Sequence, residues 1–382
     1  MASRAETTVL HVRIVSGTGG GPEKTIANSP RHMRGSGFRA FAAYLHAPGD
    51  PGIAEVARRA DAAGCELIAI PDAFAIDPRT LQKLARLCRE RDVRIWHGHD
   101  YKSNLFGWLL ARRCDLKLFS TVHGWVKHTQ KTPLYFAVDR FALRRYDEVV
   151  AVSQDLFDEC ARFGVQRERL TLIENAIDTE QFRRVRAASE SPLRASLPAR
   201  RLLVGAMGRL SEEKGFHFLI EAFERAVDAG CELALWIAGE GDQKERLAAQ
   251  ITASRHRDRM QLVGFVADPV AFQEALDLYV LSSLREGLPN VVLEAMAMEV
   301  PVLATRSGGM DAFARDENDA LLVAPGSVDE LERGLVRLAR DAELRARLAR
   351  SARARVERDQ SFARRMQKEI ALYERLMRAG GG

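Results

Sequence analysis

The chain has 382 residues, of which 46% are hydrophobic and 29% charged, which is typical of a globular protein and excludes a disordered or fibrous one. This length is enough for two domains of ordinary size. No apolar run approaches the ~18 residues that span a bilayer. The N-terminal segment lacks an apolar stretch followed by a small-residue cleavage site, so we expect a cytoplasmic protein.

The net charge of +5 is unevenly distributed. Residues 1–184 contain 28 Lys and Arg against 22 Asp and Glu, a difference of +6, whereas residues 185–382 contain 29 against 30. The basic first half indicates either an anionic partner or solvated, Arg-rich helix faces. The five cysteines are scattered without a CxxC pair, which favours reduced thiols over disulfides or a zinc site.

Strand-like and helix-like segments alternate through the first half, which predicts a parallel sheet covered on both faces. The expected strands are 9–15, 38–44, 66–70, 93–97, 118–123, 148–152 and 170–173. The expected helices between them include 51–63, 78–91 and 101–112.

The pattern restarts after a polar segment at 183–197, read as a linker or short helix. Strands are expected at 201–207, 233–238, 260–263, 278–281, 301–304 and 321–323, followed by Arg-rich amphipathic helices at 327–358 and 362–377. We therefore predict two Rossmann-like, doubly wound domains, residues 1–182 and 183–361. Ligands would bind at the carboxyl ends of both sheets, in a cleft between the domains.

Gly19 to Pro22 follow the first strand and could let backbone amides approach a phosphate. Neither a Walker A motif nor GxGxxG fits, because residue 23 is Glu and residue 22 is Pro. An ordinary strand–helix turn explains these glycines equally well.

A more specific segment is 285–294, REGLPNVVLE, which follows a strand and has Pro289 suited to a helix start. It places Glu286 in a loop and Glu294 in the helix, where two carboxylates could accept hydrogen bonds from sugar and ribose hydroxyls. In isolation, a capped surface helix with ordinary acidic residues is the simpler interpretation. Two other loops change that balance.

The first of these loops, 208–215, has the sequence GRLSEEKG. Its Arg209 and Lys214 could clamp two phosphates and neutralise a departing nucleoside diphosphate. The second loop contains Ser307, Gly308 and Gly309 after another strand, and it offers further backbone donors. A charged surface turn is the alternative reading of 208–215.

Together these segments resemble the retaining glycosyltransferases of the GT-B fold, glycosyltransferase family 4 type, which include bacterial mannosyl-, glucosyl- and N-acetylglucosaminyltransferases. Glu286 and Glu294 match the E-x7-E motif, and 208–215 resembles the GRL and EKG elements. The segments 238–241, 174–178 and 121–124 resemble the AGxG, NGID and THG elements. The resemblance implies that a terminal helix at about 362–382 packs on the first domain.

The resemblance also implies roles for individual residues. Arg209 and Lys214 would hold the diphosphate, Glu294 the ribose hydroxyls and Glu286 the transferred sugar, with His123 near that sugar. The other implied donor contacts are Gly308, Gly309, Leu288, Asn290 and, near the base, Val266. Gly20 and Gly21 would close on the donor phosphates or the acceptor.

His99 is expected at a strand end on the same edge of the sheet, where a lone histidine is either structural or functional. A metal pair of His97 and His99 is not favoured, because no third ligand is evident. The chain has no Asp-x-Asp motif, so Arg209, Lys214 and backbone dipoles would replace a divalent metal. We expect no metal and no cofactor besides the nucleotide-sugar co-substrate.

Three positions depart from the family pattern: Ala176 replaces a Gly, Asp311 stands where Glu is usual, and Ala320 replaces another Gly. None of them touches the phosphate-binding segment. They indicate subfamily variation or a member of reduced activity.

The resemblance implies metal-independent, retaining transfer of a hexose or N-acetylhexosamine from a UDP-sugar, or less commonly a GDP-sugar, to a glycan or lipid-linked acceptor. A nucleotide-sugar epimerase and a non-catalytic nucleotide-sugar-binding protein are the alternatives. The basic first half raises the hypothesis of a polyprenyl-linked acceptor at the inner face of the membrane. Anionic lipid would then meet Arg144, Arg145, Lys127 and Lys131. No motif for reading nucleic acid is present.

Overall fold

The computed structural model describes residues 6–74, 76–124, 132–195, 197–198, 200–286 and 288–379. Contacts divide the chain into two units. Unit 1 contains Met1–Glu174 and Ala363–Gly382, and unit 2 contains Asn175–Phe362. The division falls before residue 182, where the sequence suggested a boundary, and the terminal segment belongs with unit 1.

Unit 1 is built on a parallel sheet in the order β3-β2-β1-β4-β5-β6-β7. Its strands are β1 (Thr7–Val15), β2 (Phe38–His46), β3 (Leu67–Pro71), β4 (Val93–Gly98), β5 (Lys117–Val122), β6 (Glu148–Ala151) and β7 (Leu170–Leu172). Its helices are α1 (Gly21–Met33), α2 (Ile53–Ala62), α3 (Pro78–Glu90), α4 (Tyr101–Cys114), α5 (Thr132–Leu143), α6 (Gln154–Arg162) and α14 (Phe362–Arg378).

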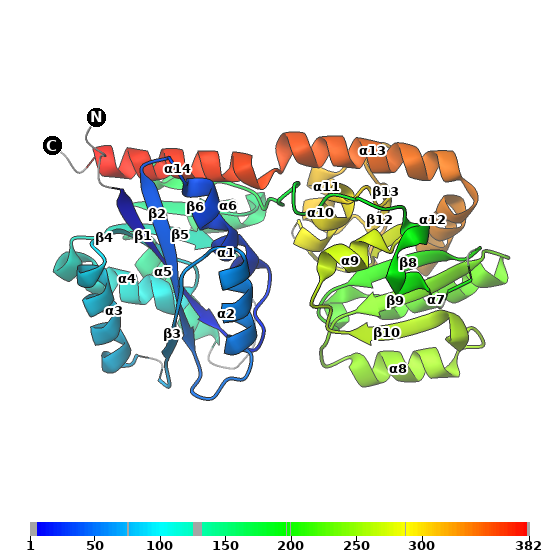
Figure 1. The fold of residues 1–382 in the computed structure, drawn as a ribbon, viewed down its shortest axis with the longest axis horizontal. Helices are drawn as coiled ribbons and strands as arrows, with labels where there is room; N and C mark the ends of the chain where they lie inside the picture. The colour runs from blue at the N-terminus through cyan, green and yellow to red at the C-terminus, as the bar shows by residue number, and fades with distance from the viewer. Residues whose placement is uncertain are drawn as a thin grey trace. The chain divides into compact units, whose positions relative to one another are not determined.

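Both faces of this sheet are buried, as strand β2 illustrates. Phe41, Ala43 and Leu45 pack with α3, α4, α5 and α6, whereas Ala42 and Tyr44 pack with α1 and α2. Because side chains alternate between the faces of a strand, a near-continuous apolar run serves both layers. Helices lie on both sides of the sheet in Figure 1.

Unit 2 repeats this architecture with a sheet in the order β10-β9-β8-β11-β12-β13. Its strands are β8 (Leu202–Met207), β9 (Leu233–Ala238), β10 (Met260–Gly264), β11 (Leu278–Leu281), β12 (Val302–Thr305) and β13 (Leu321–Val323). Its helices are α7 (Phe216–Asp228), α8 (Lys244–Ala253), α9 (Pro269–Glu274), α10 (Asn290–Ala297), α11 (Gly309–Phe313), α12 (Val328–Arg340) and α13 (Ala342–Asp359).

The two-domain prediction from the sequence is confirmed, with all the predicted strands present and their ends shifted by no more than two residues. The segment expected as one helical stretch at 327–358 is two helices. Asp341 separates them, because its side chain accepts from the Leu344 amide and so caps the start of α13.

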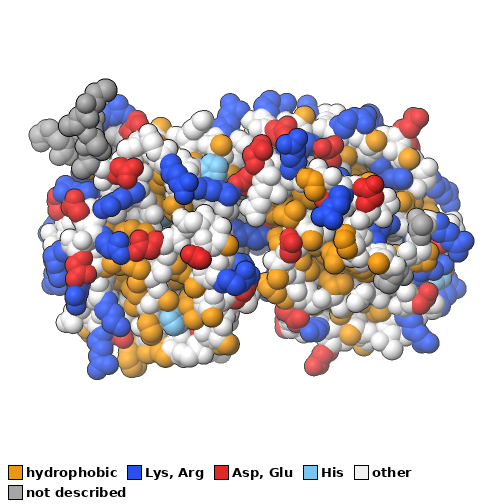
Figure 2. Space-filling model, in the orientation of Figure 1, with side chains coloured by type: hydrophobic (Ala, Val, Ile, Leu, Met, Phe, Trp, Pro, Cys, Tyr) orange, Lys and Arg blue, Asp and Glu red, His pale blue; other side chains and the backbone are white. Residues whose placement is uncertain are grey.

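Charged side chains cover both units in Figure 2, where Lys and Arg are interspersed with Asp and Glu over the face shown. No helix in the described part of the chain combines the length and apolar character needed to cross a membrane.

Candidate functional site

In unit 2, three loops leave the carboxyl ends of the adjacent strands β8, β11 and β12. These loops lead into or contain the three segments that the sequence singled out, 208–215, 285–294 and 307–309. The strand order reverses between β8 and β11, and ligands of open parallel sheets bind beyond the carboxyl ends of the strands at such a reversal. The topology therefore brings the predicted donor-binding residues to one edge.

The centre of this edge is an ion pair between Lys214 and Glu286. Both side chains are about one-fifth exposed, at 19% and 20%. The Ser283 hydroxyl also donates to the Glu286 carboxylate, at 3.3 Å, and Ser282 donates to the Lys214 carbonyl at 2.9 Å. The sequence analysis assigned the two charges to different parts of a ligand and did not foresee that they pair with each other.

Backbone packing fixes the position of Glu286. Its carbonyl accepts from the Gly309 amide at 3.2 Å. Gly308 has φ 52°, and a Cβ there would lie 2.7 Å from the same carbonyl oxygen, so a side chain is excluded by both strain and space. The two glycines thus serve first to let the 306–308 loop approach Glu286 closely.

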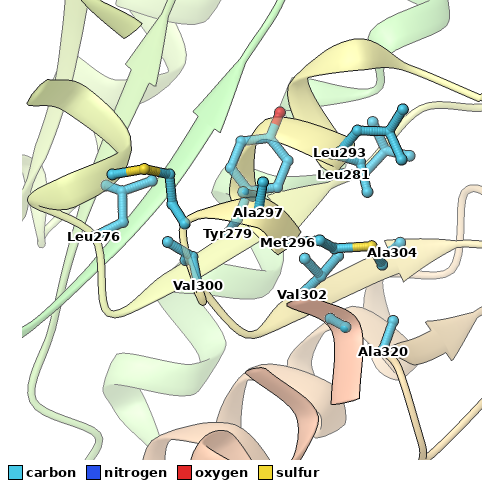
Figure 3. Packing of buried hydrophobic residues seen from close by; sticks show 14 of the residues in the cluster. Leu276, Tyr279, Leu281, Leu293, Met296, Ala297, Val300, Val302, Ala304 and Ala320 are labelled. Carbon is cyan, nitrogen blue, oxygen red and sulfur yellow. The ribbon is translucent and has the colours of Figure 1, made fainter. Parts of the chain in front are cut away.

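Glu294 lies in α10 and is fully buried. In Figure 3, Leu293 and Met296 of α10 lie with Tyr279 and Leu281 of β11 in one apolar cluster that holds this helix against the sheet. Burial raises the pKa of Tyr279, and the charges of Glu294 and Glu286 act in the same direction. Contact between Glu294 and a ribose would require a local movement that uncovers its carboxylate.

The remaining predicted donor contacts follow strands of the same sheet. Arg209 is exposed, and its charge, with that of Lys214, adds to the Ser211 hydrogen bond in lowering the pKa of Glu213. Asn290 begins α10, and its side-chain carbonyl oxygen is buried without a hydrogen-bond partner among the described residues. Leu288 is buried, and Val266 is half-buried after β10.

In unit 1, the predicted glycine loop leads into α1, but its amide is occupied. The Gly20 amide donates to the Glu23 carboxylate at 2.6 Å, and Arg13 pairs with the other oxygen of Glu23 at 2.5 Å. Gly21 is the first residue of α1. A phosphate would reach the Gly20 amide only if the Glu23 carboxylate moved away.

Four histidines gather at the neighbouring strands β1, β4 and β5. Strand pairing sets His11 beside His97, and His99 lies between His11 and His123. The expectation that His97 and His99 have no third partner is wrong, because the potential ligand atoms of His11, His97 and His99 all lie within 4.8 Å of one another. A histidine in the strand 9–15, which is apolar apart from His11 and Arg13, was the signal that could have indicated His11.

The last helix contributes buried polar groups to this histidine group. The Tyr373 hydroxyl lies 2.7 Å from His97 Nδ1 and donates to Glu369 at 2.9 Å. Arg365 faces Glu369 at 3.5 Å and donates to the carbonyls of Ile173 and Glu174. All three side chains of α14 are buried, so the helix forms part of the interior of unit 1.

Burial keeps the histidines of this group uncharged. It lowers the pKa of His11 to about 3, and it lowers the pKa values of His97, His99 and His123 well below their usual range, with nearby positive charge adding to the effect. An unfolded chain binds protons at these residues near pH 6.5, so the stability they contribute is present above that pH and lost as pH falls.

We therefore expect unit 1 to unfold more readily as pH falls from 7.5 to 5.5. Each neutral histidine contributes about 1.4 kcal/mol of lost stability per pH unit below its unfolded pKa. The urea midpoint of unit 1 is measured at the two pH values, with hydrogen exchange of peptides from β1 and β4 as the readout. A midpoint for unit 1 that does not fall on acidification would contradict the prediction.

Both halves of the chain match known family models. Residues 192–355 match the model described as "Glycosyl transferases group 1", and residues 19–181 match "Glycosyltransferase Family 4". The chain belongs to the group 1 glycosyltransferases. The family resemblance inferred from the motifs is thereby confirmed.

Curated relatives include other glycosyltransferases. The lipopolysaccharide core biosynthesis glycosyltransferase LpsE of Rhizobium meliloti is 34% identical over 205 residues, 54% of this chain and 57% of the relative. A 2-deoxystreptamine glucosyltransferase of Streptomyces kanamyceticus is 30% identical over 56% of this chain and 58% of its own length. The chain thus spans somewhat over half the length of these two relatives.

Solved structures confirm the GT-B fold of this group 1 glycosyltransferase. HepE of Anabaena, crystallised with UDP, superposes with a TM-score of 0.81 at 21% identity, covering 96% of this chain and 100% of that one. Sucrose-phosphate synthase of Thermosynechococcus elongatus superposes with a TM-score of 0.77 at 19% identity, covering 98% and 100%. The α/β, two-sheet architecture predicted from the sequence is the one these proteins share.

Proposed function

We propose that this protein is a metal-independent, retaining glycosyltransferase that moves a hexose or N-acetylhexosamine from a nucleotide-diphosphate sugar to a glycan or lipid-linked acceptor. The observation that carries the proposal is the Lys214–Glu286 pair at the carboxyl edge of the second sheet, with Arg209 in the same loop as Lys214. A cation and a carboxylate there match the two halves of a nucleotide sugar, the diphosphate and the sugar hydroxyls.

The Lys214–Glu286 pair also offers a way to bind the donor. Glu286 neutralises Lys214 until a diphosphate takes over that role, and the carboxylate is then available to accept hydrogen bonds from the sugar. The buried carbonyl oxygen of Asn290, which has no partner among the described residues, is an acceptor suited to a ligand hydroxyl. UDP is the favoured nucleotide, because HepE and its UDP-glucose complex share this fold.

The same groups support the proposed chemistry. As the glycosidic bond to the donor phosphate breaks, Arg209 and Lys214 stabilise the negative charge that accumulates on the departing diphosphate. The leaving phosphate takes the proton of the acceptor hydroxyl, which attacks on the same face of the sugar, so the anomeric configuration is retained. His123 lies beside the transferred sugar in this proposal.

A thermal-shift screen tests donor binding. With UDP or a UDP-sugar at one hundred times its dissociation constant, unit 2 is expected to gain about 2.7 kcal/mol of stability. The shift should persist in EDTA, because Lys214 and Arg209 supply the positive charge. A shift that disappears in EDTA and returns with Mg²⁺ or Mn²⁺ would contradict metal independence, and a shift only with GDP would reassign the base.

A lipid-linked acceptor is favoured by one surface of unit 1. Arg144 and Arg145 are exposed directly after α5, and the Arg145 guanidinium lies 3.6 Å from the centroid of the Phe141 ring. Leu109, Leu134 and Phe141 are partly exposed on α4 and α5. Lys127 and Lys131, the other predicted contacts, lie outside the described residues. A curated relative from Escherichia coli, 24% identical over 70% of this chain, is named as acting on a diphosphoundecaprenol-linked acceptor.

Contact with anionic membrane is tested by vesicle sedimentation. Removing two cations near an anionic surface is expected to weaken binding by about 2 kcal/mol, roughly 30-fold. The double variant Arg144→Ala and Arg145→Ala should therefore sediment less with phosphatidylserine vesicles. The matched control is Arg86→Ala with Arg89→Ala on α3, two exposed arginines of unit 1 that are not among the proposed contacts. Equal sedimentation of both double variants and the parent protein would rule out this contact.

Two alternative functions make different predictions. A nucleotide-sugar epimerase would isomerise the donor with no acceptor present, and a non-catalytic binder would show the thermal shift without any turnover. NMR of the donor after incubation, with and without a lipid-linked acceptor, separates the three. Transfer that yields the same anomeric configuration as the donor supports the proposal.

A further inference from the structure

Three imidazoles of unit 1 form a continuous chain of hydrogen bonds. His11 Nδ1 lies 3.0 Å from His99 Nε2, and His99 Nδ1 lies 3.1 Å from His123 Nε2. The rings of His11 and His99, and those of His99 and His123, are stacked with interplanar angles of 25° and 23°. Two ring nitrogens take part in neither of these hydrogen bonds. They are Nδ1 of His123 at one end of the series and Nε2 of His11 at the other.

The protons on these rings are coupled. The three histidines are neutral near pH 7, since burial lowers their pKa values, and a neutral imidazole has one N–H and one lone pair. Each N···N hydrogen bond uses one N–H from one ring and one lone pair from the next. The position of the proton on any one ring therefore fixes the tautomers of the other two.

Only two arrangements satisfy both hydrogen bonds. In the first, all three rings are protonated on Nε2, and His123 has a lone pair on Nδ1. In the second, all three rings are protonated on Nδ1. His123 then has an N–H on Nδ1 that is not used between the histidines, and His11 has a lone pair on Nε2.

The surroundings of His11 decide between them. Its Nε2 is buried and has no hydrogen-bond partner among the described residues, so the first arrangement would leave a buried N–H unsatisfied, which is rare in proteins. The positive charge of Arg365 also acts on His11. A lone pair near a positive charge is favourable, whereas an N–H near it is not. The buried Nε of Arg365 likewise has no partner among the described residues.

We propose that His11 and His99 are positioning residues that hold His123 in the tautomer protonated on Nδ1, so that His123 acts as a hydrogen-bond donor and not as a base. The oxygen that receives this bond would belong to the transferred sugar, a point that rests on the proposed function. The tautomer itself does not depend on that function. The hydrogen bonds among the three histidines thus let the neutral His123 side chain donate an N–H of fixed direction without a neighbouring negative charge.

Metal binding is the alternative role for these histidines, and their contacts disfavour it. His97, the third member of the potential metal group, is engaged on both sides, with Nδ1 2.7 Å from the Tyr373 hydroxyl and Nε2 2.8 Å from the Thr121 hydroxyl. Because each imidazole offers a single nitrogen to a metal, the ion would have to replace one of these two contacts and one of the hydrogen bonds of His99 to His11 and His123. Among the ring nitrogens of His11, His97 and His99, Nε2 of His11 alone lacks a hydrogen-bond partner among the described residues.

Long-range ¹H–¹⁵N correlation spectra of the full-length protein, labelled with ¹⁵N in histidine and without donor, test the proposal directly. The expected result is protonation on Nδ1 for His11, His99 and His123, assigned by single His→Gln variants. Protonation of His123 on Nε2 would overturn the proposal. So would about one equivalent of zinc in the purified protein that is lost in a His11→Asn variant, because a coordinated nitrogen carries no proton.

Two substitutions at His11 separate positioning from packing. His11→Asn retains an N–H near the position of Nδ1, and His11→Leu does not. Loss of one net hydrogen bond predicts a 3- to 10-fold lower kcat/KM for His11→Leu, with most of the loss recovered in His11→Asn. In His11→Leu, the His123 ring should also exchange between tautomers. Equal losses in both variants with an unchanged His123 tautomer would refute the positioning role.

This design also remains informative if His11→Leu fails to fold, because the spectra of the parent protein and of His11→Asn decide the tautomer. Failure of the proposed function is recognised separately. It would appear as a lack of turnover and of any UDP-induced thermal shift, while the tautomer of His123 in the free protein is read without a substrate.

Discussion

Replacing Lys214 with alanine is expected to weaken UDP binding by about 10- to 100-fold, the loss of one charge-assisted hydrogen bond to phosphate. The loss in kcat/KM should be larger, on the order of 10²- to 10³-fold, because the lysine also stabilises charge that develops on the leaving group. Calorimetric titration with UDP and initial rates with a UDP-sugar measure the two effects. Lys83→Ala, at an exposed position on α3, is the matched control.

A second variant distinguishes phosphate binding by Lys214 from its pairing with Glu286. Glu286→Gln removes the charge of the partner and leaves Lys214 in place. If Lys214 binds the diphosphate, Glu286→Gln retains UDP affinity but loses turnover, since the carboxylate is proposed to contact the sugar. If Lys214 serves only to hold Glu286, the two variants affect UDP affinity to the same extent, which would contradict the proposed role.

The largest effect on stability is expected at Glu369. This carboxylate faces Arg365 one helical turn away in α14, and both side chains are buried. Glu369→Ala leaves a buried guanidinium without a counter-charge and removes the acceptor of the Tyr373 hydroxyl. Loss of one partner of a buried pair typically costs about 3–5 kcal/mol, so unit 1 should unfold at markedly lower urea.

The same helix supplies the control. Glu374 and Arg378 have the same i,i+4 spacing, but their side chains are 49% and 76% exposed. Glu374→Ala is expected to change the free energy of unfolding by less than about 1 kcal/mol. Hydrogen exchange of β4 peptides across a urea series reports on unit 1 by itself. Similar shifts for the two variants would show that the Arg365–Glu369 pair contributes no more than an exposed one.

The fold could be predicted from the sequence because its signals are local and repeated. Runs such as 202–207 and 233–238 are apolar, short and bounded by loops, and they alternate with amphipathic helices. The motif residues Glu286 and Lys214 could be placed at one sheet edge, because parallel strands share the edge at which their carboxyl ends lie.

The contacts within the candidate site were less predictable. The Lys214–Glu286 pair joins loops far apart in the chain, and motif spacing does not distinguish a residue that holds a ligand from one that holds another residue. His11 gave no motif, since its role depends on the pairing of β1 with β4. Tyr373 and Glu369 lie in a helix whose docking on unit 1 was expected only from the family resemblance.

The docking of α14 also has a consequence for biosynthesis. A ribosome that has completed residue 174 has made every strand of unit 1, yet Glu369 and Tyr373, which cover His97, come about 200 residues later. At about 5–20 residues per second, that interval lasts roughly 10–40 s. During this time the histidine group of unit 1 lacks the contacts made by α14. Unit 1 therefore reaches its final state only after unit 2 has been synthesised.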